Sequence, residues 1–117
     1  MNLIDTSVWI DHLEAVDPEL VQALQQNLVL VHPWVMGELS LCGFQQRRPF
    51  LEKLSLQSQA LVIEESLVLK MIQTQHLYDA GLSWVDCQLL ASAKAMQVNL
   101  WTHDKALKKA WARVCRS

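Results

Sequence analysis

The stretch that decides the fold is Asn-Leu-Ile-Asp-Thr-Ser-Val-Trp-Ile-Asp-His, residues 2–12. Residues 2–4 are typical of a short buried strand, and the polar residues 5–7 follow it without a linker. A helix is expected to continue through residues 8–12. A strand that runs directly into a helix is the first half of the unit that builds parallel sheets. The segment therefore predicts an α/β fold, with Asp5 at the carboxyl end of its first strand.

The same alternation of strands and helices continues along the chain. Further apolar runs predict strands at residues 28–31, 60–63 and 98–102. Caps and apolar residues spaced for one helix face predict two helices in each interval, including a short one at residues 49–54, and one helix after the last strand. The expected order is β-α-α-β-α-α-β-α-α-β-α. This order implies a parallel sheet covered by helices on both faces, in which functional sites gather beyond the carboxyl ends of the strands.

Length and composition narrow the class of protein. With 117 residues, 51% of them hydrophobic and 19% charged, we expect one domain with a packed core and no disorder. The apolar runs are too short to cross a bilayer, and Asp5 and Asp11 interrupt any secretory leader. Cys42, Cys87 and Cys115 are odd in number and widely spaced, which argues against disulfides and zinc knuckles and favours a reducing cytoplasm. The net charge of −2 excludes a strongly basic nucleic-acid-binding domain but leaves room for a local basic surface.

Four acidic residues fall near one edge of the predicted sheet, although they are far apart in the sequence. Asp5 ends the first strand, and Asp104 lies just beyond the last. Asp86 opens a helix, and Glu38 lies in the first turns of the helix after the second strand. Taken singly, Asp5 and Asp104 have an ordinary explanation as helix N-caps, and Asp86 as the capping-box partner of Ser83. Glu38 stands in a mostly apolar segment without a cation within one helical turn, so it needs another partner.

Taken together, the four carboxylates indicate a metal site. Side by side they would repel one another, which hinders their ionisation or draws in a cation. Oxygen ligands suit Mg²⁺ and Mn²⁺, and Mg²⁺ takes few carboxylates and completes its shell with water and phosphate. Such an ion activates a water molecule and neutralises charge on an in-line transition state. The pattern therefore favours metal-assisted hydrolysis of a phosphodiester.

Four blocks of the sequence closely resemble the signature blocks of PIN-domain ribonucleases, and among these the VapC toxins of bacterial type II toxin–antitoxin pairs. The blocks are LIDTSVWI at residues 3–10, PWVMGEL at 33–39, GLSWVDCQLLAS at 81–92 and LWTHDK at 100–105. They stand in the family's order and extend over essentially the whole chain. The resemblance implies a single PIN domain over residues 1–117. Its fold would be a PIN-like three-layer α/β/α arrangement with a central, mostly parallel sheet of four to five strands.

The resemblance also implies an activity and its residues. The family cleaves RNA endonucleolytically, leaving a 5′-phosphate and a 3′-hydroxyl, with Mg²⁺ or Mn²⁺ as cofactor. The acidic quartet that binds this metal is matched here by Asp5, Glu38, Asp86 and Asp104. The hydroxyl positions that would orient a carboxylate or a water are matched by Thr6 or Ser7 and by Thr102.

The family's partners are implied in the same way. VapC toxins are usually dimeric, and a cognate VapB-type antitoxin silences them by laying its tail over the active site. We therefore expect an RNA substrate, a homodimer and a hetero-oligomer with an antitoxin, in the cytoplasm and without a membrane partner. The sequence departs from the family at Cys87 and Gln88, where Ala and His often stand, and this change could alter substrate contacts without removing a metal ligand.

Basic residues are unevenly distributed and indicate where a nucleic acid could be held. Lys105 directly follows Asp104. In the last quarter of the sequence Asp104 is the single acidic residue. Arg47 and Arg48 form a second pair. Phosphate contacts supply affinity without sequence information, so Lys105, Arg47 and Arg48 are candidate substrate-binding residues. An ordinary solvated helix face explains any single lysine equally well.

Two other functions stay open on the sequence alone. An aspartyl-phosphate phosphatase would use Asp5 as its nucleophile, but that chemistry commonly needs a second acid two residues later, where this chain has Ser7. The main alternative is a non-catalytic RNA- or protein-binding module on the same fold. The presence of all four acids places both behind the nuclease.

Overall fold

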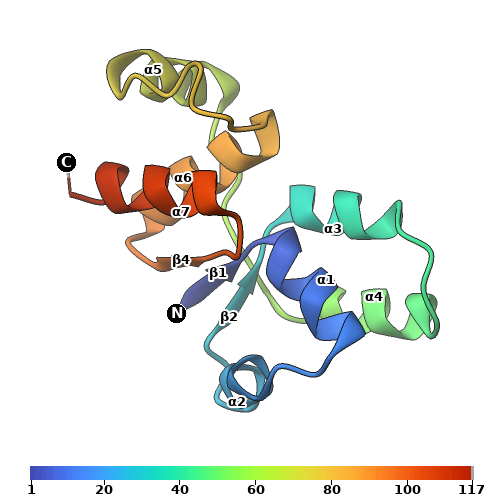
Figure 1. Ribbon diagram of the computed structural model, residues 1–117. Helices are drawn as coiled ribbons and strands as arrows, with labels where there is room; N and C mark the ends of the chain where they lie inside the picture. Colours follow the sequence, from blue (N-terminus) through green and yellow to red (C-terminus); the bar gives the residue numbers. More distant parts are fainter. Residues whose placement is uncertain (117) are drawn as a thin grey trace.

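The computed structural model describes residues 1–116 of the chain (Figure 1). Within these residues, four short strands and seven helices follow the order expected from the sequence. They are β1 (Asn2–Ile4), α1 (Thr6–Glu14), α2 (Pro18–Gln25), β2 (Val29–Val31), α3 (Pro33–Ser40), α4 (Arg47–Ser55), β3 (Ser58–Gln59), α5 (Glu65–Thr74), α6 (Trp84–Met96), β4 (Asn99–Trp101) and α7 (Lys105–Val114). No helix among these residues is long and apolar enough to cross a membrane.

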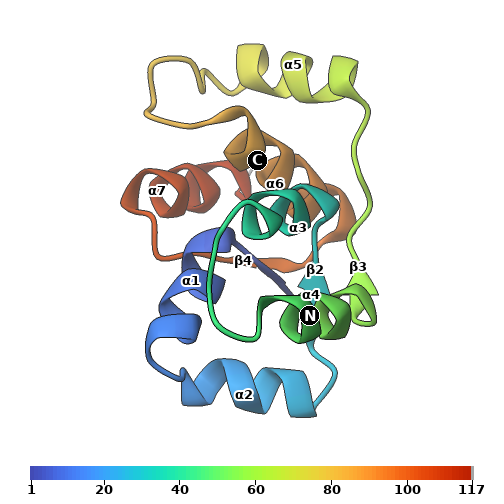
Figure 2. The same ribbon diagram turned by 90° about the vertical axis from the view of Figure 1, so that its right-hand side faces the viewer.

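The four strands form one sheet in the order β3-β2-β1-β4, and every neighbouring pair is parallel. The chain moves from β1 to β2 to β3 in one direction and then returns to the other side of β1. Because parallel crossovers are right-handed, this reversal places the later helices on the opposite face. Figures 1 and 2 show α1, α3 and α4 on one face of the sheet and α6 and α7 on the other. The expected three-layer α/β/α fold is confirmed, with four strands.

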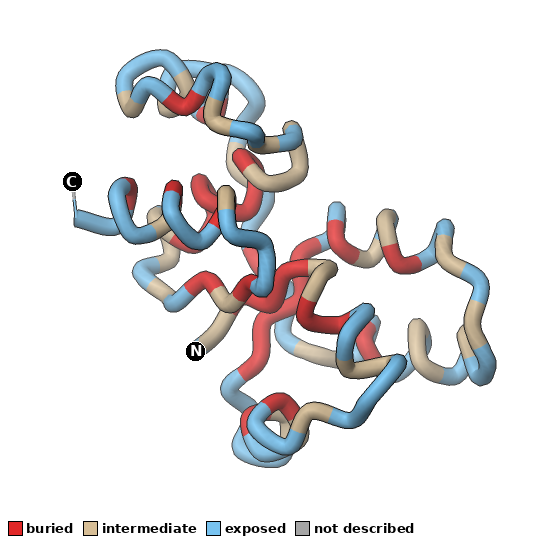
Figure 3. Tube along the Cα trace, in the orientation of Figure 1, coloured by how far each residue is buried: buried red, intermediate tan, exposed pale blue. Residues whose placement is uncertain are grey.

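The core lies on both faces of β1. Leu3 and Ile4 are fully buried, and β1 pairs them with Leu100 and Trp101 of β4. A strand that is covered on both faces is expected to be apolar throughout, and β2 is likewise buried at every residue. Figure 3 shows the buried residues gathered along these strands and the inward sides of the helices. On the α1 side, the fully buried indole of Trp9 packs edge-to-face on Phe50 at 5.9 Å.

The third strand was wrongly placed by the sequence pattern. The apolar run at residues 60–63 predicted it, whereas β3 consists of the exposed residues Ser58 and Gln59. β3 is an edge strand held by backbone pairing to Leu30 and Val31, so its side chains carry no apolar signal. The last backbone contact is the 2.9 Å hydrogen bond from Ala60 N to Val31 O, after which the chain leaves the sheet. Other element boundaries differ from the expected ones by one or two residues.

Hydrogen bonds of the buried His32 side chain connect the start of α3, the helix α6 and the segment just after β3. His32 has no exposed surface, and its Nδ1 accepts a hydrogen bond from Trp34 N at the start of α3. Because Nδ1 accepts, the neutral ring carries its proton on Nε2 and donates to Ser92 Oγ of α6, 3.0 Å away. Ser92 Oγ in turn donates to Leu61 O at 2.7 Å, just beyond β3. Burial lowers the pKa of His32 from 6.5 to about 4.

This shift predicts a defined dependence of stability on pH. Between pH 6.5 and about 4 the unfolded chain binds a proton at His32 that the folded chain does not, so the free energy of unfolding falls as the pH falls through that window. The loss amounts to roughly 3 kcal/mol at most. Urea unfolding at a series of pH values measures it. His32→Asn lacks the titrating ring, and an undiminished pH slope in this variant would contradict the assignment.

Candidate functional site

Asp5 is the buried centre of the candidate site. It follows β1 and caps α1, and its side chain is 5% exposed. Oδ1 accepts a hydrogen bond from Thr6 N at 2.8 Å, and Oδ2 accepts from Ser7 Oγ at 2.7 Å and from Thr102 Oγ1 at 2.6 Å. These three donors compensate the carboxylate for its lost hydration and fix the orientation of both oxygens.

Thr102 connects Asp5 to the end of the neighbouring strand. It follows β4, and its hydroxyl donates to Asp5 while accepting a 3.0 Å hydrogen bond from Asp104 N. Asp104 then caps α7 by accepting from Leu107 N at 2.9 Å. Because β1 and β4 are parallel neighbours, the residues after both strands meet at the same edge of the sheet. Asp5, Thr102 and Asp104 thus belong to one hydrogen-bond network.

Glu38 joins this network through a hydroxyl. It lies on α3 and is partly exposed, and Thr6 Oγ1 donates to its Oε1 at 2.5 Å. Thr6 therefore bridges two acids, because its backbone amide binds Asp5 and its side chain binds Glu38. The expected partner of Glu38 is thus a hydroxyl from α1, 32 residues away in sequence. Sequence spacing gives no signal for a contact between two helices of this kind.

Asp86 is the fourth acid, and its environment is electrostatically unfavourable. The capping box expected with Ser83 is present: Ser83 N donates to Asp86 Oδ2 at 2.9 Å and Asp86 N donates to Ser83 Oγ at 3.1 Å. Burial raises the pKa of the Asp86 carboxyl, and the negative charges of Asp5 and Asp104 raise it further, while the hydrogen bond from Ser83 opposes them. The structure therefore brings Asp86 within electrostatic reach of the acids that end β1 and β4.

The acidic side chains supply the kind of donor atoms that the metal expected from the sequence would need. All four side chains offer carboxylate oxygens, the ligands preferred by Mg²⁺ and Mn²⁺, and a cation would relieve the repulsion felt by Asp86. Among residues 1–116, however, no three His, Cys, Asp or Glu side chains converge closely enough to hold one ion. Mg²⁺ commonly binds through one or two carboxylates and keeps several waters. The residues therefore fit an ion held by one or two of the acids and by water.

The three basic residues expected at the substrate have different surroundings. Lys105 is exposed and begins α7 directly after Asp104. Arg47 donates from Nε to Cys42 O at 3.1 Å and from Nη2 to Ser40 O, which fixes the connection between α3 and α4. Arg48 pairs with Glu52 on the surface of α4 at 3.3 Å. A substrate contact stays a prediction for all three, and Lys105 has the position next to an acid.

One pair beside the site was not anticipated from the sequence. His103 Nδ1 and Asp11 Oδ2 lie 2.5 Å apart, and both side chains are substantially exposed. The backbone amide of His103 also donates to Ser7 Oγ at 3.0 Å, so the pair borders the network around Asp5. His103 stands out in the sequence through its position before Asp104, but Asp11 lies on another helix and gives no local signal.

The network makes Thr102 a residue with a measurable structural role. Thr102→Val keeps the side-chain shape but leaves the buried Asp5 carboxylate and Asp104 N each short of one partner. We expect the free energy of unfolding to fall by about 1–3 kcal/mol, as measured by urea denaturation. Thr102→Ser retains the hydroxyl and serves as the matched control. Equal stability of the Val and Ser variants would show that the hydroxyl does not support Asp5.

Comparison with known proteins agrees with this geometry. The family model for the PIN domain matches residues 3–111. Ribonuclease VapC32 of Mycobacterium tuberculosis, from two strains, is 41% identical over 113 residues, which cover 96% of this chain and 91% of the relative. The crystal structure of PAE2754 from Pyrobaculum aerophilum superposes with a TM-score of 0.61 over 99% of this chain and 96% of that one, at 14% identity, and so shares the fold. On the family model and the near-complete alignment, this chain belongs to the PIN-domain family.

Proposed function

We propose that this protein is a divalent-metal-dependent endoribonuclease that acts as the toxin of a VapBC-type toxin–antitoxin pair. The observation that carries the proposal is the electrostatic proximity of Asp86 to Asp5 and Asp104, whose negative charges add to the effect of burial in raising the pKa of Asp86. Such a cluster is suited to a hard cation and a phosphodiester. The likeness to a ribonuclease along 96% of the chain supports the assignment of RNA as the substrate.

In this proposal the four acidic side chains form the metal site, and neighbouring hydroxyl groups orient those side chains by hydrogen bonding. Asp5, Glu38, Asp86 and Asp104 are its candidate ligands, of which one or two bind the ion directly and the others act through water. When bound, Mg²⁺ or Mn²⁺ supplies an activated water and neutralises charge on the phosphate in the in-line transition state. The hydroxyls of Ser7 and Thr102 both donate to Asp5 Oδ2 and so orient the Asp5 carboxylate, and the Thr6 hydroxyl orients Glu38. The acids are thus positioned before the substrate arrives.

We also propose the partners that the family suggests. An apolar groove of about 450 Å³ runs along α3 beside Glu38. Trp34 on its wall is 41% exposed and Leu41 is 89% exposed, and exposed apolar surface of this kind marks protein–protein contacts. A cognate VapB-type antitoxin that covers this groove would lie next to the acids and block RNA. A homodimer, and a cytoplasmic location that keeps the three cysteines reduced, complete the proposal.

The proposal is tested with purified protein and total cellular RNA. We expect discrete fragments in Mn²⁺ or Mg²⁺ and none in EDTA. Asp86→Asn keeps a side-chain oxygen for the capping box but removes the charge, so we expect cleavage to fall by at least about a hundredfold with little change in the unfolding midpoint. Asp5→Asn is expected to reduce cleavage in the same way and also to lower the unfolding midpoint, because one amide oxygen replaces the two carboxylate oxygens that accept from Thr6 N and from the two hydroxyls. Glu19→Gln, which neutralises an exposed acid on α2 outside the network, is the control and should retain cleavage.

Other outcomes would support the other functions. Folded protein that does not cleave RNA when it is supplied with Mn²⁺ or Mg²⁺, and whose RNA binding is undiminished in EDTA, would be a non-catalytic RNA-binding module. Turnover of small phosphoesters with a covalent phosphate on Asp5 would indicate a phosphatase. Full cleavage by Asp86→Asn would show that the Asp86 carboxylate is not needed as a metal ligand.

A further inference from the structure

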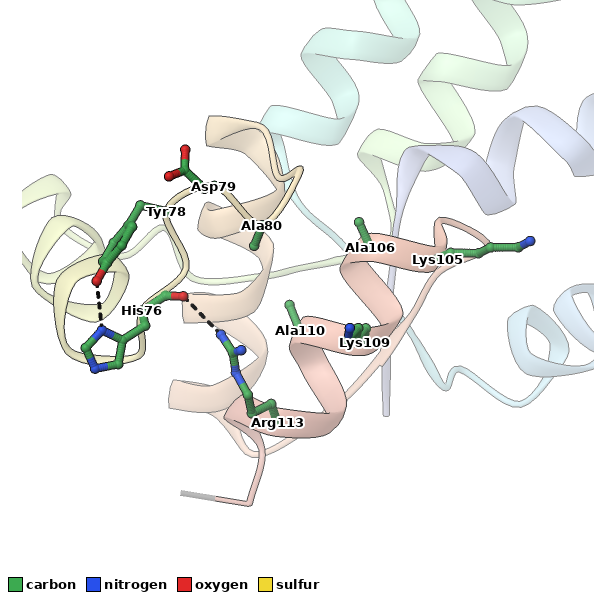
Figure 4. A pocket seen from close by; sticks show the side chains of 9 residues that line it. All are labelled: His76, Tyr78, Asp79, Ala80, Lys105, Ala106, Lys109, Ala110 and Arg113. Carbon is green, nitrogen blue, oxygen red and sulfur yellow. Dashed lines mark hydrogen bonds between the residues drawn. The ribbon is translucent and has the colours of Figure 1, made fainter.

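Besides the groove along α3, the protein has a hollow between α7 and the connection from α5 to α6. It has a volume of about 540 Å³, within the range of sites that hold small ligands. Its walls come from residues 76–80 and from the facing side of α7, and Figure 4 shows Ala80, Ala106 and Ala110 turned toward one another across it. Small side chains on both walls leave the space between them open.

The wall formed by residues 76–80 is held in place by specific contacts. Arg113 Nη2 crosses from α7 and donates to Gln75 O at 2.9 Å and to His76 O at 3.2 Å. The Tyr78 hydroxyl lies 3.0 Å from His76 Nδ1, and the two rings meet edge-on at 5.9 Å. These contacts fix an aromatic side chain that is still 54% exposed. A fixed, exposed ring is a suitable surface for a nucleobase to stack on.

The opposite wall is positively charged. Lys105 and Lys109 are exposed and lie one turn apart on α7, about 6 Å along the helix axis. Among residues 1–116 neither lysine forms an ion pair, and the sequence has no acid after Asp104. Figure 4 shows the Lys105 side chain extending from the start of α7 on the side away from Tyr78, and the Asp79 carboxylate pointing away from that helix. Two unpaired ammonium groups on one helix face suit successive phosphates of an extended strand.

Both walls of the hollow lead along the chain to one of the four acids, Asp104 on one side and Asp86 on the other. Lys105 follows Asp104 at the start of α7, and the opposite wall leads through Ser83 into the turn that holds Asp86. A polyanion cannot approach a cluster of carboxylates without nearby positive charge to offset the repulsion. Arg47 and Arg48 are engaged with backbone carbonyls and with Glu52, whereas the lysines of α7 are not.

We propose that this groove binds the single-stranded RNA segment next to the cleaved phosphate. Lys105 and Lys109 contact its phosphates, and the ring of Tyr78 stacks on one of its bases. The inference rests on the proposed ribonuclease function, because it places the RNA beside the four acids. It assigns RNA contacts to Lys109 and Tyr78, and it predicts that single strands are preferred to duplexes, whose bases are not free to stack on a side chain.

The test measures RNA binding separately from cleavage. A fluorescein-labelled single-stranded RNA of about 12 nucleotides is titrated with the full chain in EDTA, and anisotropy is followed at several salt concentrations. Lys105→Ala/Lys109→Ala should weaken binding at least about tenfold and make the logarithmic salt slope shallower by about 1.4, the value for two lost phosphate contacts on a single strand. Lys53→Ala/Lys70→Ala, which removes the same charge from α4 and α5, is the matched control and should stay within about twofold.

The role of Tyr78 is tested by the strength of RNA binding and its dependence on salt concentration in Tyr78 variants. Tyr78→Ala should weaken binding about tenfold with an unchanged salt slope, because stacking releases no counterions. Tyr78→Phe keeps the ring and should bind like the wild type. An unlabelled duplex of the same sequence should compete poorly.

Cleavage of cellular RNA in Mn²⁺ is scored in parallel, so that the two proposals fail separately. Cleavage by the wild type with unchanged RNA binding in both the lysine and tyrosine variants would overturn the groove and leave the ribonuclease standing. Weakened binding in these variants without any cleavage would support the groove and count against the ribonuclease. Equal weakening by the control pair, or no binding by the wild type, would also overturn the groove.

Discussion

The hydrogen bond from Thr102 to Asp5 joins the two strand ends on which the whole site depends. β1 and β4 are parallel neighbours, yet the helices that follow them leave toward opposite faces of the sheet (Figures 1 and 2). A crevice opens wherever the winding of a parallel sheet reverses in this way. Asp5 and Asp104 stand on its two sides, and the remaining acids reach it from α3 and α6. The strand order therefore brings together residues that are up to about a hundred positions apart in the sequence. Thr102 holds the residues after β1 and β4 in place by bonding to both Asp5 and Asp104.

The carboxylates that we propose as metal ligands also stabilise the first turns of helices. Asp5 and Asp104 are the N-caps of α1 and α7, and Asp86 completes the capping box of α6 with Ser83, which explains their residue type without any ligand. The amino ends of these helices also carry partial positive charge, which lets negative side chains gather there at lower cost. Capping alone, however, does not require three helices to direct their caps toward one another. The pKa of Asp86 is raised mainly by burial and further by the charges of Asp5 and Asp104, and this electrostatic proximity is the feature that capping leaves unexplained.

The sequence predicted the parts of the structure that depend on local chemistry. Apolar runs, caps and the capping box of Ser83 with Asp86 gave the order of the elements and located the acids near the strand ends. β3 was misplaced because an edge strand is defined by its partner's backbone and not by its own side chains. The bond from Thr6 to Glu38 and the pair of His103 with Asp11 depend on how helices pack, so no local pattern contains them.

The direction of α7 explains how an acidic site can stand beside a basic surface. Asp104 caps its amino end, where negative charge is favoured, and Arg113 lies in its last turn, where positive charge is favoured. The helix dipole therefore stabilises both charges in the arrangement that a polyanion bridging a metal site and a phosphate-binding surface would need. Lys105 stands one residue from Asp104, well within the roughly 8 Å over which charges act at physiological salt. The dipole disfavours a positive charge at the amino end of α7, so local helix stability explains Asp104 and Arg113 but not Lys105, whose position is explained by the proposed contact with a polyanion.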